Sequence, residues 1–441
     1  MRRNREYAGG VLSNAAADPP VKPGRAAGPP ASRSRAAARS GRAAAGSAVG
    51  PVRRRPKDRR ERIAQVAAEL FCEHGYHGVS LEQIASTVGI SGPAVYRHFP
   101  NKYALLVEAT RGLLAAALST TDLPPGAEPR TTLKALLLTL SRLAVKHRRS
   151  GGLYQWEWRY LEPEHRAEFR ADLAVLFGRL VVPLRAARPE ELTVPDAEAL
   201  ARAALSVFGS ITTHRTPITK GRAEVALHRI AVAVLRDDPP TPVVPSPAGS
   251  GLERGAVRVS SRREIVLAEA IRLFHQNGYH AVGLDEIGRA AGITASSVYR
   301  YFPGKGELLA AALYRASERV AAATAAALAD AADASQALHM MADSYVTLTF
   351  ERSDLVSVYL AENNNLPEID RHELRKVQRL HVEEWVRLLT TVRPGLPVPE
   401  ARVHVHAALN LVTDLSGWVR FDRRTGMDRH LVRLMVTVLM A

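Results

Sequence analysis

Length, composition and charge exclude several classes of protein before any motif is considered. The chain has 441 residues, of which 46% are hydrophobic and 6% aromatic, enough for roughly two to four domains. No run of about 18 apolar residues indicates a membrane span, and the N-terminus lacks the apolar segment typical of a secretory signal. The single cysteine, Cys72, rules out an intramolecular disulfide and a thiolate metal cluster. We therefore expect a cytoplasmic protein.

The net charge of +16 lies mostly at the start of the chain. Residues 1–58 hold about 13 Lys and Arg against about 3 acidic residues, and they are rich in Ala, Gly, Pro and Ser. With almost no large apolar side chain to bury, this basic tail is expected to be disordered. Two interpretations stay open: added nonspecific affinity for phosphate, or a solvated extension, including a start codon assigned too early.

The first folded unit opens with three short helices joined by tight turns. Apolar side chains within 63–71 recur at the spacing of one helix face, and Gly75 follows where a helix end needs a left-handed residue. Ser80 and the glutamine three residues later form a capping box for a second helix. Gly89 permits a tight turn, and Ser91 can cap a third helix. This pattern predicts a helix-turn-helix.

The third helix turns an unusual set of side chains outward. Val95 and Phe99, four residues apart, point into the core. The side chains left on the outer face are Tyr96, Arg97 and His98. Lys102 follows in the first turn of the next helix, where the macrodipole disfavours a cation, so we expect an anion such as a DNA phosphate beside it.

The whole unit is duplicated. Residues 95–102 read Val-Tyr-Arg-His-Phe-Pro-Asn-Lys, and residues 298–305 read Val-Tyr-Arg-Tyr-Phe-Pro-Gly-Lys. Without a gap, about 23 of about 51 aligned positions are identical, and the match continues, shifted by one residue, through about 180–190 residues. Long Ala- and Leu-rich amphipathic segments follow each helix-turn-helix, with no alternating strand pattern.

We therefore expect an all-α fold of two tandem units. The expected parts are a basic tail (1–58), a first helix-turn-helix domain (59–109), a first helical regulatory domain (110–236), a Pro- and Gly-rich linker (237–260), a second helix-turn-helix domain (261–312) and a second helical regulatory domain (313–441).

The motif Tyr-x-His/Tyr-Phe-x-x-Lys, followed by Leu-Leu and a helical domain, resembles the TetR family of transcriptional regulators. The resemblance is specific over about 59–109 and 262–312. It implies DNA contacts from Ser80, Ser91, Gly92, Pro93, Tyr96, Arg97, His98 and Lys102 in the first copy. In the second copy it implies contacts from Thr294, Ala295, Ser296, Tyr299, Arg300, Tyr301 and Lys305.

The types of these side chains divide their expected roles. Tyrosine and lysine suit phosphate contacts, which position a protein without reading sequence. Arg97 and Arg300 can reach a guanine or a phosphate; the alternative is that each pairs with an acidic residue of its own unit. Because Gly92-Pro93-Ala94 and Ala295-Ser296-Ser297 differ, we expect the two units to read non-identical half-sites of a double-stranded operator.

The resemblance also implies an assembly and an effector. Family members usually repress transcription as homodimers, and a small molecule in the helical domain moves the DNA-binding units. The two copies here can pair as an intramolecular pseudo-dimer, or two chains can form a homodimer with four reading heads; both remain open. Aromatic and polar side chains that can line pockets for a small hydrophobic effector are Trp156, Trp158, Tyr160, Tyr345, Tyr359 and Glu362. Ordinary helix packing is the commoner use of such residues.

We expect neither a cofactor nor a metal, because His404 and His406 alternate and point to different helix faces. No catalytic motif recurs between the copies, so an enzyme with accessory DNA-binding units has no support and we expect no enzyme. The leading hypothesis is a ligand-responsive repressor acting on DNA at the nucleoid. The alternative is a DNA-binding regulator without a small-molecule effector, controlled by a protein partner or by abundance.

Overall fold

The computed structural model describes residues 56–124, 126–154, 160–238 and 261–441. The expected tail lies outside these residues except for its last part, where the first helix already begins at Pro56. Most of the expected linker also lies outside them. Every regular element within the described residues is a helix, which confirms the all-α fold. None of these helices combines the length and apolarity that crossing a membrane requires.

The first unit begins with the expected helix-turn-helix, α1 (Pro56–His74), α2 (Leu81–Val88) and α3 (Gly92–Tyr96). The capping box of α2 is formed: the Ser80 hydroxyl accepts from the Gln83 N–H at 3.1 Å, and the Gln83 side chain accepts from the Ser80 N–H at 2.7 Å. Gly89 ends α2 with a φ of 79°, in the left-handed region that favours glycine. Local sequence therefore fixes both ends of α2.

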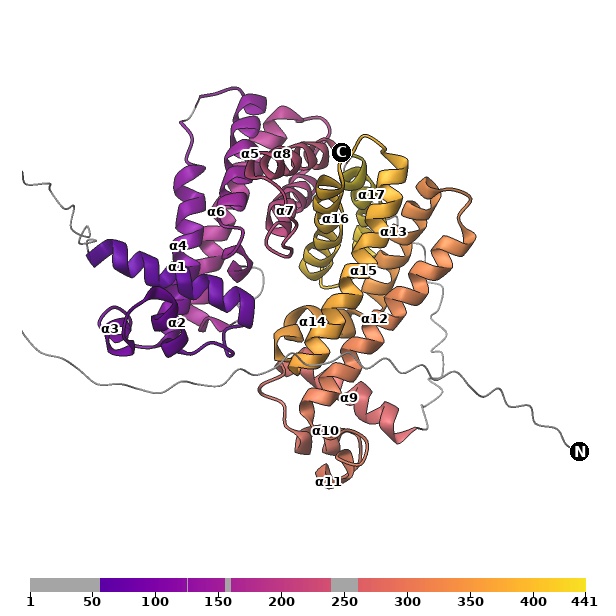
Figure 1. Cartoon of the computed structure of the whole chain (residues 1–441). Helices are drawn as coiled ribbons and strands as arrows, with labels where there is room; N and C mark the ends of the chain where they lie inside the picture. The colour runs from indigo at the N-terminus through magenta and orange to yellow at the C-terminus, as the bar shows by residue number, and fades with distance from the viewer. Residues whose placement is uncertain (1–55, 125, 155–159, 239–260) are drawn as a thin grey trace, which may run out of the picture. The chain divides into compact units, whose positions relative to one another are not determined.

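Longer helices complete the first unit. They are α4 (Lys102–Thr120), α5 (Pro129–Lys146), the 3₁₀ turn η1 (Gly151–Tyr154), α6 (Pro163–Ala187), α7 (Val194–Ser210) and α8 (Lys220–Arg236). In Figure 1, α4, α5 and α6 form a bundle above α1 to α3.

The second unit repeats this order. Its helix-turn-helix is α9 (Arg262–Asn277), α10 (Leu284–Ala290) and α11 (Ala295–Val298). Its body is α12 (Lys305–Asp330), α13 (Ala334–Glu351), α14 (Ser353–Glu362), η3 (Asn363–Asn365), α15 (Glu368–Val392), α16 (Val398–Trp418), η4 (Arg423–Thr425) and α17 (Met427–Met440). The helices α13, α15, α16 and α17 lie side by side in Figure 1.

Bonds at matching positions show that the repeat extends to the ends of the bodies. In the first unit, Arg188 at the end of α6 donates to the carbonyl of Leu235 at 2.8 Å. In the second, Arg393 at the end of α15 donates to the carbonyl of Leu439 at 2.7 Å. Each arginine satisfies a carbonyl that the last turn of the final helix leaves without an intrahelical donor.

The two helix-turn-helix domains are built on different cores. The apolar interior of the first domain continues into both helical bodies as one cluster, which includes Phe71, Leu105 and Leu411. The second domain has its own cluster, centred on residues such as Phe274 and joined to Leu355 of α14. The first head therefore shares its buried surface with the bodies, whereas the second packs mainly on α12 and α14.

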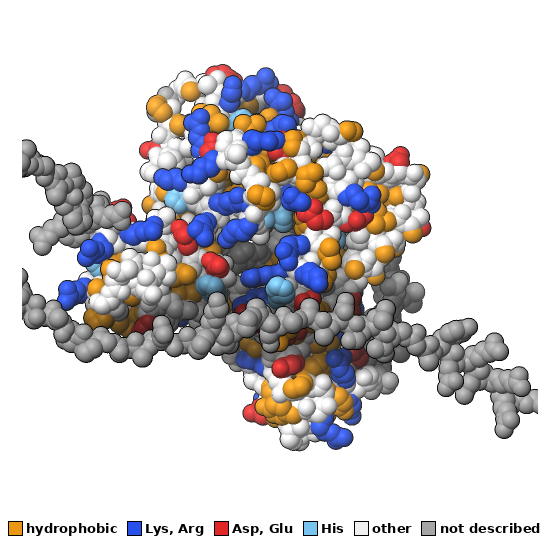
Figure 2. Space-filling model, in the orientation of Figure 1, with side chains coloured by type: hydrophobic (Ala, Val, Ile, Leu, Met, Phe, Trp, Pro, Cys, Tyr) orange, Lys and Arg blue, Asp and Glu red, His pale blue; other side chains and the backbone are white. Residues whose placement is uncertain are grey.

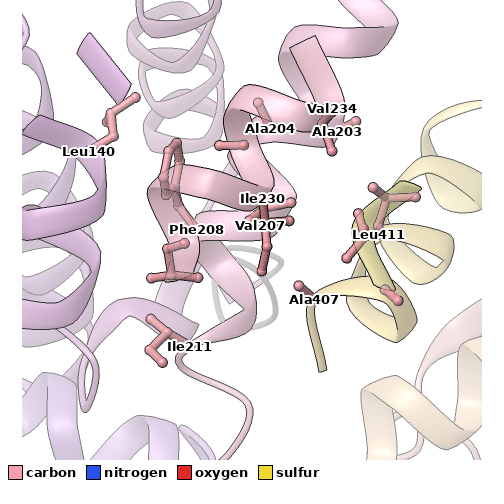
Figure 3. Packing of buried hydrophobic residues seen from close by; sticks show 14 of the residues in the cluster. Leu140, Ala203, Ala204, Val207, Phe208, Ile211, Ile230, Val234, Ala407 and Leu411 are labelled. Carbon is pink, nitrogen blue, oxygen red and sulfur yellow. The ribbon is translucent and has the colours of Figure 1, made fainter. Parts of the chain in front are cut away.

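The terminal helices of the two units pack against each other. Figure 3 shows Ala407 and Leu411 of α16 across from Val207 of α7, with Ile230 of α8 nearby. All four side chains are fully buried, so they contribute to the core as if they belonged to one domain. An ion pair at 2.8 Å between Arg222 and Glu400 joins the same faces.

Candidate nucleic-acid interface

The third helix of each unit presents the side chains that its sequence predicts. Val95 and Val298 are fully buried, which anchors α3 and α11 to their domains. Tyr96 is 53% exposed and Tyr299 is 56% exposed. A large aromatic side chain is thus open to solvent at the same position in both copies.

Arg97 and Arg300 stand beside these tyrosines and are exposed. Within the part of the chain that the structure describes, neither guanidinium forms an ion pair. The neighbouring Arg60 differs, because it is paired with Glu108 at 2.8 Å. The alternative that Arg97 and Arg300 are held by acidic residues of their own unit is therefore not what this structure shows.

A hollow of about 450 Å³ lies beside the third helix of the first unit. Ser80 at the start of α2, Tyr96 of α3 and Lys102 of α4 all line it. The N-terminus of a helix offers backbone N–H groups and the positive end of a dipole, which suit an anion. The hollow therefore combines groups from three helices, and the Glu82 carboxylate lines it beside them.

The two lysines are bound within the protein, which corrects the argument from the helix dipole. The Lys102 ammonium donates to the carbonyls of Tyr76 and Val79, both at 3.0 Å. Lys305 makes the same two bonds to Tyr279 and Val282, both at 2.9 Å. These carbonyls offset the unfavourable position in the first helical turn, so no external anion is needed to explain it.

The tyrosine ring below each ammonium completes this arrangement. Lys102 lies 4.6 Å from the centre of the Tyr76 ring, and Lys305 lies 4.3 Å from that of Tyr279. Partial burial lowers the pKa of both lysines. Each ammonium has three N–H donors, and two of them are used in the bonds to the loop carbonyls.

The starts of the two reading helices differ in chemistry as expected. In α3, Gly92 and Pro93 follow Ser91, whose side chain makes no capping bond. In α11, the Thr294 hydroxyl accepts from the N–H of Ser297 and lies 2.9 Å from the Ser296 hydroxyl. The second head therefore presents hydroxyl groups where the first presents an apolar ring.

His98, Tyr301 and Ala295 are less open than their neighbours. All three are half-buried. The backbone carbonyl of His98 accepts a hydrogen bond from Arg60, whose guanidinium lies 4.3 Å from the centre of the Phe99 ring. These three residues are therefore less accessible to a partner than the neighbouring tyrosines and arginines.

Sequence reasoning missed a clamp on each reading helix. Arg60 covers the ring of Phe99, and Arg263 covers the ring of Phe302 at 4.6 Å. Both phenylalanines are buried. The signal was present, because this arginine recurs at matching positions in both copies, but its role depends on a contact across the domain.

Two of the expected pocket residues lie at the junction between head and body instead. Tyr160 stacks on Tyr76 with ring centres 5.6 Å apart and packs on His77 at 4.7 Å. Glu362 is buried and accepts from Asn365 at 2.7 Å. A ligand pocket lined by these two residues stays a prediction. Trp156 and Trp158 lie outside the described residues.

Tyr345 and Tyr359 do lie together inside the second body. Burial raises the pKa of Tyr345 to about 12, with a further contribution from Tyr359 nearby. The Tyr359 hydroxyl accepts from Gln378 at 2.6 Å. Burial also lowers the pKa of the adjacent His381 to about 4, and its Nε2 accepts from the indole N–H of Trp385. This set places several polar groups within an apolar bundle.

The two head regions match a known family model. Residues 63–109 and 266–312 both match the model of bacterial regulatory proteins of the tetR family. The chain carries two TetR-family DNA-binding domains. Each match falls within a helix-turn-helix expected from the sequence, so the expected tandem duplication is confirmed.

Curated transcriptional regulators are similar to parts of the chain. The HTH-type transcriptional repressor KstR2 of Rhodococcus jostii is 28% identical over 124 residues, covering 28% of this chain and 61% of that protein. The HTH-type transcriptional activator FasR of Mycolicibacterium smegmatis is 33% identical over 78 residues, covering 16% of this chain and 36% of that protein. The chain thus spans less than two thirds of these curated relatives.

Solved TetR structures also align with single units. The regulator PfmR from Thermus thermophilus is 27% identical, with a TM-score of 0.34, over 40% of this chain and 97% of its own. KstR2 of Mycobacterium tuberculosis is 21% identical, with a TM-score of 0.36, over 42% of this chain and 95% of its own.

The chain that follows the tail is moderately basic as a whole. Without the tail, about +6 of the net charge remains for the rest of the chain. In Figure 2, Lys and Arg side chains are spread widely over the visible face, with acidic ones among them. Among the residues that the structure describes, the visible face therefore carries no large area of a single charge sign.

Proposed function

We propose that this chain is a transcriptional regulator that binds a double-stranded DNA operator with two non-equivalent reading heads. The observation that carries the proposal is the pair of helix-turn-helix surfaces whose tyrosines and arginines are exposed at matching positions. Their shared residues suit the DNA backbone. Their different first turns, Gly92-Pro93 against Ala295-Ser296, suit different base sequences.

In this proposal the first head holds phosphate through the groups around the hollow. Tyr96 and the start of α2 hold one phosphate at the hollow beside Ser80, and Lys102 uses its remaining N–H donor on the same backbone. Arg97 and Arg300 extend toward base edges of the major groove, where arginine pairs best with guanine. The proposed operator is an imperfect palindrome or two distinct elements.

Selection of binding sites from random double-stranded DNA by the full chain tests this proposal. Two different half-sites are expected in every enriched sequence, and a perfectly symmetric palindrome would contradict two different readings. Affinity for the selected site should fall steeply with salt, with a slope of several phosphates. A flat salt dependence would count against DNA binding itself.

We propose further that the regulator is a repressor released by a small hydrophobic effector bound in the second body. The support is the cluster of Tyr345, Tyr359 and Gln378, which offers a few polar groups within apolar helices. Of the first unit's pocket residues, Trp156 and Trp158 are not described and Tyr160 packs on the head. The two units therefore need not share an effector.

A thermal-shift screen of hydrophobic metabolites tests the effector. A true ligand should raise the unfolding midpoint of the wild-type chain, because it binds the folded protein. It should also weaken operator binding, as expected of an effector that releases a repressor. The variant Tyr359→Phe keeps the ring but loses the hydroxyl and should weaken the response. If no compound acts on either property, control by a protein partner or by abundance becomes the better explanation.

A further inference from the structure

The contacts between the two units involve equivalent positions of the repeat, so that a position in one unit meets its counterpart in the other. In this part of the repeat, a residue of the first unit matches the residue 204 positions later, as Ala203-Ala-Leu205 matches Ala407-Ala-Leu409. Ser206 of α7 and Asn410 of α16 thus occupy the same position, and they touch each other across the interface. A residue that meets its own counterpart marks a pseudo-twofold axis.

A second pair of contacts follows the same rule. His214 stacks on His406, with ring centres 4.1 Å apart and planes 11° apart. The matching positions hold Trp418 and Arg202, and the Arg202 guanidinium lies 4.8 Å from the centre of the Trp418 ring. The same two positions of the repeat therefore contact each other on both sides of the axis. On one side they hold two histidines, and on the other an arginine and a tryptophan.

A polar cluster lies at the axis, and its side chains differ between the two units. The Ser206 hydroxyl donates to Asp414 Oδ2 at 2.6 Å. The two N–H groups of Asn410 Nδ2 are shared among three acceptors, which are the Ser206 carbonyl at 3.0 Å, the Ser206 hydroxyl at 2.9 Å and Asp414 Oδ2 at 3.0 Å. Ser206 and Asn410 are buried. One carboxylate thus receives donors from both units.

The first unit has no carboxylate at the matching position. Asp414 corresponds to Ser210, which is fully buried and donates to the carbonyl of Val207 in its own helix. The Asp414 carboxylate therefore has no counterpart in the first unit. In the observed pairing it accepts from the serine of one unit and from the asparagine of the other.

We propose that the pairing faces are matched so that the first unit selects the second unit as its partner. A second unit facing another second unit would place two Asp414 carboxylates and two Asn410 side chains around one axis. The serine donor would be missing and two like charges would share a largely buried site. The partner that fits this face is the other copy within the chain.

Pairing of two first units is disfavoured for a different reason. Arg202 would lose the ring of Trp418 and face His214 instead. Arg148 donates to the His214 carbonyl at 3.2 Å, so that position already has a cation next to it. The charge-assisted bonds to Asp414 would be lost as well. Both like-with-like pairings are thus less favourable than the mixed pairing.

Contacts at the rim occur in only one direction as well. Arg433 of α17 pairs with Asp237 at 3.1 Å, and Thr437 donates to the same carboxylate at 2.9 Å. The position matching Asp237 is Ala441, which has no carboxyl side chain, so the pair has no counterpart across the axis. The Asp237 side chain is only 7% exposed, which makes this pair stronger than an ordinary surface pair.

Mixed pairing has a consequence for the DNA complex. Because both units belong to one chain, the effective concentration of one for the other is high, which favours pairing within the chain. In a dimer of chains in which first unit paired with first unit and second with second, the unfavourable contacts described above would be buried at the interfaces. The regulator is thus one chain with a fixed order of two different heads.

Variants of the full chain test the matching. The clash variant Ser206→Asn with Ser210→Asp gives the first unit the face of the second. It should lower the thermal unfolding midpoint by several degrees, and sedimentation velocity should show an expanded or self-associating chain. The swap variant adds Asn410→Ser and Asp414→Ser, which exchanges the two faces. It should restore both the midpoint and the compact monomer.

Recovery in the swap variant would show that the residues act by matching one unit to the other, and not by stabilising their own helices. Val225→Asp, at a position on α8 that is 64% exposed, controls for an added carboxylate and should change neither readout. A swap variant as impaired as the clash variant would overturn the proposal. A clash variant that behaves like the wild type would overturn it too.

A milder variant covers the case in which the clash variant does not fold. Asn410→Ser with Asp414→Ser removes the charge and leaves serine at all four positions. Differently tagged chains carrying it should exchange into mixed oligomers to a greater extent than wild-type chains. Equal exchange by the two proteins would show that these residues do not select the partner.

Discussion

In the proposed DNA complex, Arg97 and Arg300 are the side chains that contact base edges. Each is exposed beside a half-exposed tyrosine, and no ion pair within the described residues holds it. A guanidinium on a short, well-anchored helix can approach guanine without breaking a bond in the protein. The free protein therefore gives up little when the arginine binds DNA.

Replacing either arginine should weaken operator binding without affecting folding. Arg97→Ala and Arg300→Ala are each expected to cost about 1–3 kcal/mol, or about 5- to 150-fold in affinity, because a bidentate contact is lost. Fluorescence anisotropy with the selected operator measures the change. Arg142→Ala, at an exposed position of α5, serves as the matched control and should bind normally.

The lysines should behave differently from the arginines. Lys102→Met removes two bonds to loop carbonyls and is expected to destabilise the first head by about 1–3 kcal/mol even without DNA. Thermal unfolding of the DNA-free chain measures this, with the exposed Lys376→Met as control. An unchanged midpoint together with weaker operator binding would mean that the lysine serves only phosphate.

At the scale of the helix, α2 and α10 differ in how they begin. Ser80 closes a capping box on α2, whereas Gly283 at the start of α10 has no side chain to do so. An N-cap bond satisfies a backbone N–H that would otherwise be left to solvent. The first head therefore depends on its cap more than the second does.

Ser80→Ala should accordingly loosen the first head. Loss of the cap is expected to cost about 1 kcal/mol of unfolding free energy, within a usual range of about 0.5–2 kcal/mol. Hydrogen exchange of the α2 amides, read peptide by peptide, would locate the loss. Ser86→Ala, an exposed position in the same helix, should leave exchange unchanged or slow it, because alanine favours helix interiors.

At the scale of the whole molecule, buried histidines link the pairing of the units to pH. Burial lowers the pKa of His404, His406 and His430 to about 4, and it lowers that of His214 well below its usual value. Arg148 adjoins both His214 and His406, Arg402 and Glu383 adjoin His406, and Arg433 adjoins His430. These side chains are neutral in the folded chain at neutral pH.

Stability should therefore fall as the solution becomes acidic. The unfolded chain takes up protons on these histidines below about pH 6.5, whereas the folded chain stays neutral there until about pH 4. Their contribution is complete above pH 6.5 and is lost between 6.5 and 4, at about 1.4 kcal/mol per pH unit for each histidine. Urea unfolding at pH 7.5, 6.0 and 5.0 measures it.

A histidine substitution identifies the source of this dependence. His406→Gln should reduce the slope of stability against pH by the share of one proton, whereas the exposed His339→Gln should not. An identical slope in the wild type and His406→Gln would show that the buried pair does not take part. Ordinary carboxylates titrate mainly below pH 5, so measurements above that value isolate the histidines.

The sequence by itself determined the features that depend on neighbours along the chain. Helical spacing within 63–71, the cap at Ser80 and the turn at Gly89 define the first helix-turn-helix. The same spacing leaves Tyr96 and Arg97 outside, because residues three and four apart share a helix face. Comparison of the chain with itself was enough to reveal the duplication.

Only the tertiary structure decided which distant groups meet. In the folded chain, Lys102 donates to loop carbonyls, Tyr160 stacks on Tyr76 and Glu362 accepts from Asn365. Across the interface, Ser206 donates to Asp414. The last two residues are 208 positions apart, and helical periodicity carries no information over that separation. Local patterns set which side of a helix is buried, but the packing of helices against one another sets what each buried side chain touches.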